Sequence, residues 1–131
     1  MLVNTNDSAV PIVGGGTLIS ASRTTTQTSL DIPTGGAMSS LNVVLDMTTV
    51  GTGSVTVTIN GKDSTSGKYY LILSGAAITT NSTNRYRVGQ MLASAANSVA
   101  QDYMPRYIQI VVTANNANAA TYSCGYSISS D

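Results

Sequence analysis

The sequence predicts an all-β domain: an antiparallel β-sandwich, or a jelly-roll-like barrel, of about eight strands with at most one short helix. Three observations lead to this prediction. Apolar and polar residues alternate with a period of two along much of the chain, as they do in strands with one buried face. Thr is abundant beside Val and Ile, and all three suit a pleated sheet. Clusters of Gly, Pro and Asn separate the alternating segments, and the helices that a parallel α/β fold requires are missing.

Four segments show the alternation most clearly: Leu41–Met47, Val55–Ile59, Ile108–Thr113 and Thr121–Ile128. In the second of them, Val and Ile at the odd positions form one face, while Thr56 and Thr58 form the other. Weaker strands are expected at Thr17–Arg23, Thr24–Ile32, Lys68–Leu73 and Arg85–Val88.

One segment has a helical pattern. In Met91–Ala100, the apolar residues Leu92, Ala95 and Val99 recur at helical spacing. The segment is short and lacks a good N-cap, so a short helix and an irregular or extended crossing both remain open.

The chain divides into an arm and one domain. Residues 1–16 contain Pro11 and three consecutive glycines, which indicate an N-terminal arm or leading strand. Residues 17–131 are expected to form a single β-sandwich domain, which is long enough to bury a core. The arm's apolar residues are candidate docking residues: Leu2, Val3, Val10, Ile12 and Val13.

The charge balance excludes several classes of function. Six Lys and Arg residues balance six acidic residues, and charged residues make up only 9% of the chain. A nucleic-acid-binding protein needs clustered cations, which this sequence lacks, so nucleic acid is not expected as a partner. No apolar run approaches the length of a membrane span, and the start lacks the pattern of a signal peptide. A surface with so little charge favours a protein that is docked in an assembly.

The stretch GKDSTSGK, residues 61–68, has the appearance of a phosphate-binding loop. That motif requires G-x-x-x-x-G-K-[ST] between a strand and a helix. Here five residues separate Gly61 from Gly67, and Tyr69 stands where the metal-binding hydroxyl belongs. The residues that follow form a strand pattern, so no helix N-terminus would face a phosphate. We therefore expect a β-hairpin whose turn is centred on Asp63–Ser66.

No catalytic or metal site is expected, and no cofactor. The chain has no His, which removes the usual Ser/His/Asp and Cys/His pairs, and its Asp residues show no paired spacing. Zinc would lack its ordinary ligands, and the loop at Asp63 lacks the further carboxylates of a calcium site. Cys124 lies on the apolar face of its strand, so we interpret it as a buried small residue. The protein is expected not to be an enzyme.

Two sets of side chains are candidates for binding partners. Arg85 and Arg87 share one strand face, which is either solvated or docked against an acidic neighbour. Tyr69-Tyr70, Tyr103 and Tyr107 either pack at the edge of the core or form a platform on which sugar rings stack.

The segments VTVTINGKDSTSGKYYLIL (55–73) and MPRYIQIVVTANNANAATYSCGYSI (104–128) resemble a group of small virion proteins encoded in the structural modules of tailed phages. The shared features are a Gly-Lys-Asp hairpin that closes on Gly-Lys-Tyr-Tyr, a Pro-Arg-aromatic strand, and a final Thr-Tyr-Ser-x-Gly strand. In this chain they are Gly61–Asp63, Gly67–Tyr70, Pro105–Tyr107, and Thr121–Ser123 with Gly125.

The resemblance implies a capsid decoration (cement) or auxiliary head protein, without enzymatic activity. Such a protein would be made in the host cytoplasm and would bind the major capsid protein on the outside of the virion. It would also self-associate, with a trimer at three-fold positions as the most plausible oligomer. The residues themselves leave open an alternative, a carbohydrate-binding module on a head or tail appendage that recognises surface glycans.

Overall fold

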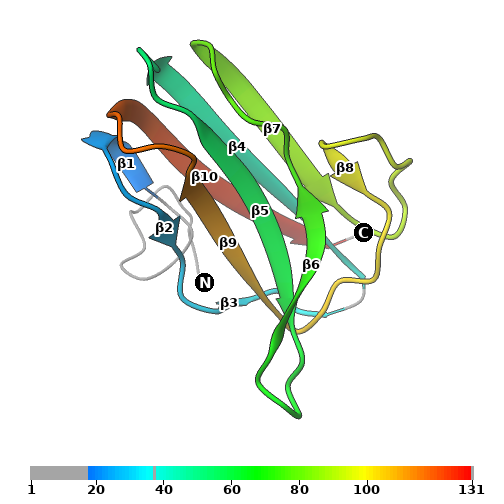
Figure 1. Ribbon diagram of the computed structural model, residues 1–131. Helices are drawn as coiled ribbons and strands as arrows, with labels where there is room; N and C mark the ends of the chain where they lie inside the picture. Colours follow the sequence, from blue (N-terminus) through cyan, green and yellow to red (C-terminus); the bar gives the residue numbers. More distant parts are fainter. Residues whose placement is uncertain (1–17, 37, 131) are drawn as a thin grey trace.

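The structure is a computed structural model that describes residues 18–36 and 38–130 (Figure 1). The expected arm at residues 1–16, with its five candidate docking residues, lies outside these residues. The described part of the chain is all-β and contains no helix, as the alternating pattern predicts. Ten strands form two sheets of five, which pack against each other.

The first sheet has the order β1-β10-β4-β7-β8. Its strands are β1 (Leu18–Arg23), β10 (Ala120–Ser130), β4 (Ser39–Thr49), β7 (Ser82–Val88) and β8 (Val99–Ala100). The second sheet has the order β2-β9-β5-β6, with β3 also paired to β9. Its strands are β2 (Gln27–Thr28), β9 (Tyr107–Ala114), β5 (Val55–Lys62), β6 (Tyr69–Ser74) and β3 (Ile32–Pro33). All pairings are antiparallel except the one between β7 and β8.

The strand order is that of a two-sheet jelly roll. When β2 and β3 are counted as one interrupted strand and the short β8 is set aside, eight antiparallel strands remain, four in each sheet. β1-β10-β4-β7 then faces β2-β9-β5-β6, and the chain repeatedly crosses from one sheet to the other. The sheets stay separate, so the fold is a sandwich and not a closed barrel.

The core lies between the two sheets and follows the period of two. Every second residue of β4 points inward, and Val43 and Leu45 are completely buried. The facing side chains come from the second sheet: Val55, Val57 and Ile59 of β5, and Ile108, Ile110 and Val112 of β9. Burial of these aliphatic side chains is the main stabilising contribution to the fold.

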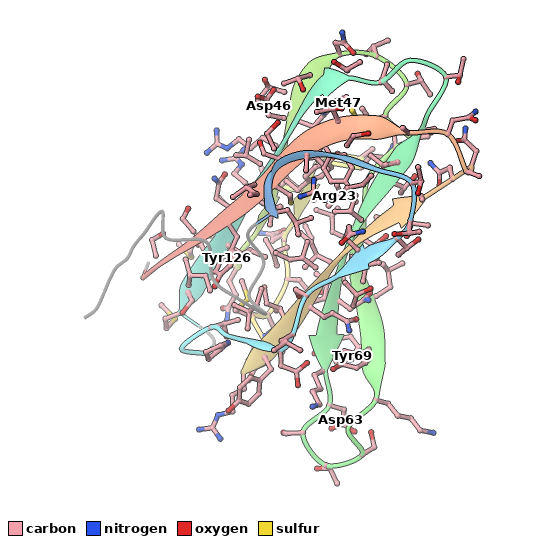
Figure 2. The ribbon with its side chains drawn as sticks, turned by 90° about the vertical axis from the view of Figure 1, so that its left-hand side faces the viewer. Arg23, Asp46, Met47, Asp63, Tyr69 and Tyr126 are labelled. Atoms are coloured by element: carbon pink, nitrogen blue, oxygen red, sulfur yellow. The ribbon has the colours of Figure 1, made fainter. Side chains whose placement is uncertain are left out.

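Arg23 fastens the edge strand β1 where the chain leaves the first sheet for the second (Figure 2). Its guanidinium donates hydrogen bonds to the carbonyl oxygens of Ile19 and Tyr122, both at 2.6 Å. It also lies over the Tyr122 ring, 4.9 Å from the ring centre. These contacts join β1 to β10 beyond the irregular register at Leu18–Ala21.

One open alternative is decided, and two expectations about local structure need correction. The segment Met91–Ala100 follows the irregular or extended alternative and not the helical one: Asn97 has a φ of 62°, which interrupts a helix, and Val99 enters β8 beside β7. The expected strand Thr24–Ile32 is broken into β2 and β3. Finally, β7 begins at Ser82, three residues before the expected start at Arg85, since its polar first half pairs with β4.

Candidate functional site

The stretch that has the appearance of a phosphate loop is the turn of the β5–β6 hairpin. The Asp63 carboxylate accepts hydrogen bonds from the Ser66 hydroxyl at 2.7 Å and from the backbone N–H of Thr65 at 3.2 Å. Gly67 supplies a φ of 76°, and its N–H donates to the Asp63 carbonyl at 2.7 Å. These bonds lower the pKa of Asp63, with the Ser66 hydroxyl as the largest cause. The hairpin prediction is confirmed.

This hairpin is one wall of an open groove at the end of the sandwich where β3 and the start of β9 also lie (Figure 1). The other walls are the loop after β3 and the segment that leads into β9. The groove has a volume of about 880 Å³. Its side chains include Tyr70, Tyr103 and Tyr107, together with Lys62, Asp63 and Arg106.

Thr34 holds two of these walls together. Its buried hydroxyl donates a hydrogen bond to the carbonyl of Pro105, and its N–H donates to the carbonyl of Arg106 at 3.0 Å. Gly36 donates in turn to the Thr34 hydroxyl at 3.2 Å. The backbone that carries Arg106 and Tyr107 is therefore fixed by the loop after β3.

Gly61 shapes the third wall by leaving room for a ring. It pairs with Tyr70 across the hairpin, and a Cβ atom added to Gly61 would lie 2.6 Å from the Tyr70 ring. Glycine is therefore required for the ring to lie flat against β5.

We predict that Gly61→Ala displaces the Tyr70 ring and changes the groove, while the fold survives because the ring is at the accessible end of a side chain. Quenching of the protein's total tyrosine fluorescence by iodide should increase, because the Tyr70 ring becomes more accessible, and the melting temperature should fall by only a few degrees. The control is Gly125→Ala, where nothing lies within 4 Å of the added methyl group. Unchanged quenching in Gly61→Ala would mean that the ring does not rest on this glycine.

Tyr69, which is labelled in Figure 2, does not line this groove but contacts a neighbouring ion pair. Its hydroxyl donates to Asp31 at 2.5 Å, and the Lys62 ammonium lies 2.6 Å from the other oxygen of that carboxylate. Hydrogen bonds from Lys62 and then Tyr69 lower the pKa of Asp31. The same contacts raise the pKa values of Lys62 and Tyr69, with the bond to Asp31 as the largest cause in each case. This cluster ties the start of β3 to the hairpin.

The predicted tyrosines are thus divided between two places. Tyr103 and Tyr107 line one groove, and Tyr70 joins them, whereas Tyr69 belongs to the Asp31 cluster. Sequence reasoning gave Arg106 no binding role. The sequence feature that could have indicated a binding role for Arg106 is its position directly after Pro105, in the turn that leads into β9.

Arg85 and Arg87 lie on the outer face of the first sheet, in the second half of β7, where Arg87 pairs with Val99 of β8. The Arg85 Nε donates to the Asn42 side-chain oxygen at 2.7 Å, and Arg87 is opposite Asn42 in the register of β7 and β4. The two cations therefore share one face, as alternation predicts, and Tyr86 between them is buried in the core.

Cys124 is buried on the core face of β10, as predicted. Burial raises the pKa of its thiol to about 12, so the thiol is protonated at neutral pH. Among residues 18–36 and 38–130, no group of three or more His, Cys, Asp or Glu residues could hold a metal ion. No helix capable of spanning a bilayer occurs in this part of the chain.

Comparisons with protein families, with curated proteins and with solved structures found no match to this chain.

Proposed function

We propose that this protein is a structural protein of a tailed-phage virion, which decorates the outside of the head and stabilises it through contacts with the major capsid protein. The observation that carries the proposal is the resemblance of residues 55–73 and 104–128 to virion proteins of this kind. Those segments are the β5–β6 hairpin and the strands β9 and β10, so the shared residues lie on three strands of the second sheet and on one strand of the first.

The character of the surface supports the same proposal. The charged fraction is low, and several large apolar side chains are more than half exposed: Ile19, Leu30, Met38, Leu71 and Met91. Ile19 and Leu71 belong to β1 and β6, which are edge strands of the sheets formed by residues 18–36 and 38–130, and edge strands present hydrogen-bonding groups that can pair with a neighbour. An assembly would bury such side chains and occupy such edges. We propose a homo-oligomer, with a trimer as the form that fits three-fold sites on a shell.

The double variant Arg85→Gln/Arg87→Gln tests the docking face. If the two cations meet an acidic neighbour, this variant should bind undecorated capsids roughly tenfold more weakly in co-sedimentation, with a smaller dependence on salt. Lys68→Gln removes an exposed cation from the hairpin and serves as the control. Equal capsid binding by the double variant and the control would show that the Arg85–Arg87 face is not part of the docking surface.

A second candidate function is carbohydrate binding, and the groove is the observation that favours it. Three tyrosines from two separate segments line one open groove, and tyrosine rings stack on sugars while their hydroxyls donate hydrogen bonds. A glycan array separates the candidates, because a protein that only binds capsid should show no saturable binding to sugars.

A further inference from the structure

We propose that the groove at the end of the sandwich is selective for an acidic saccharide, whose carboxylate is bound by Arg106. This inference rests on the carbohydrate-binding function proposed above and names the class of ligand for that site.

The groove has the size and the aromatic surface that a short oligosaccharide requires. Its volume of about 880 Å³ falls in the upper part of the usual range for small-ligand sites, about 300–1,000 Å³. Tyr70, Tyr103 and Tyr107 are 44%, 60% and 37% exposed, so their rings remain accessible although they are anchored on strands or beside them. Such rings can pack against the apolar faces of sugar rings.

Three charged side chains line the groove, and two of them already have partners. The Lys62 ammonium forms an ion pair with Asp31 at 2.6 Å, and the Asp63 carboxylate, which keeps its negative charge, accepts the hydrogen bonds of its own turn. The guanidinium of Arg106 has no hydrogen bond, ion pair or ring contact within residues 18–36 and 38–130. Among the described residues, Arg106 is therefore the cation of the groove whose hydrogen-bond donors are available to a ligand.

The backbone that carries Arg106 is held in place, which restricts the directions in which the Arg106 side chain can extend. Both carbonyls of the Pro105-Arg106 pair accept hydrogen bonds from Thr34, which is itself buried. A guanidinium is planar and binds a carboxylate through two parallel hydrogen bonds. Tyrosine rings that can stack on sugars lie next to this unpaired guanidinium. Together they favour a ligand that carries both a ring and a carboxylate, as uronic and sialic acids do.

The experiment measures binding by isothermal titration calorimetry with two matched pairs of probes. Trigalacturonate is compared with its methyl ester, and 3′-sialyllactose is compared with lactose. We expect at least one acidic probe to bind about tenfold or more tightly than its neutral partner. In Arg106→Gln this preference should disappear, whereas in Tyr103→Ala both members of the pair should weaken. Lys68→Gln, on the same hairpin but outside the groove, should behave like the unmodified protein.

Each other result overturns the inference in a different way. Equal binding of acidic and neutral probes, unaffected by Arg106→Gln, would leave the carbohydrate function standing and remove the acidic selectivity. Equally tight binding of a tetra-aspartate peptide would show that the groove recognises charge alone. No binding of any sugar would refute the carbohydrate function and the selectivity together. Arg106 and Tyr103 are exposed, so the melting temperature of each variant should match that of the unmodified protein.

Discussion

Replacement of Leu45 by Ala is expected to lower the free energy of unfolding by about 2–5 kcal/mol. Leu45 is completely buried at the middle of β4, which is the central strand of its sheet. On its own sheet it lies between Asn84 and Cys124, and its side chain enters the cluster shared with β5 and β9. Truncation therefore removes apolar contact and leaves a cavity that rigid strands on both sides cannot fill.

The control for this variant is its neighbour in the sequence. Val44 points to the outer face of the same strand and is only half-buried, so Val44→Ala should change the unfolding free energy by no more than about 1 kcal/mol. Urea unfolding followed by tyrosine fluorescence measures both. Similar losses in the two variants would mean that the register of β4 is shifted by one residue, because such a shift exchanges the two faces.

Deletion of residues 1–13 is expected to leave the sandwich folded but to weaken capsid binding by about tenfold or more. In the described part of the chain, every fully buried apolar residue lies at or after Ile32, so the deletion removes none of these core residues. The deleted segment carries the candidate docking residues Leu2, Val3, Val10, Ile12 and Val13. Ordering of a glycine-containing arm costs conformational entropy, which contacts within an assembly can offset.

Thermal melting, size-exclusion chromatography and co-sedimentation with undecorated capsids compare the truncated and complete chains. The predicted outcome is a melting temperature within a few degrees of the original, with reduced self-association and capsid binding. An unfolded truncation would show that the arm is a core strand. Undiminished capsid binding would place the docking surface elsewhere, with Arg85 and Arg87 as the next residues to replace.

The fold could be predicted from the sequence where one physical signal dominates. Strands with one buried face alternate visibly, and this signal located β4, β5, β9 and β10. It left Met91–Ala100 undecided, because small apolar residues there fit a helical spacing, whereas pairing with β7 places Val99 in a strand. It also missed the break between β2 and β3, which both pair with β9 in the same sheet. At the break, the Ile110 N–H donates to the Ser29 side-chain oxygen, and the sequence does not indicate that exchange.

The groove was harder to predict because its parts are distant in the sequence. The sequence pattern groups Tyr69 with Tyr70 in one candidate set, whereas the structure separates them, with Tyr69 at Asp31 and Tyr70 in the groove. Nothing local indicated that Tyr70 would meet Tyr103, or that Thr34 would fasten the backbone of Arg106. Those contacts depend on the jelly-roll order, which brings the hairpin, the loop after β3 and the entry to β9 to the same end.

The central claim is that this protein coats a phage head, and its number of copies in the particle tests that claim most directly. Virions are purified from cells that express this chain together with the other structural proteins of the phage. The chain is then quantified by mass spectrometry relative to the major capsid protein. A decoration protein occupies symmetric sites over the whole shell, so the predicted result is on the order of hundreds of copies per virion. A handful of copies, or none, would contradict the account.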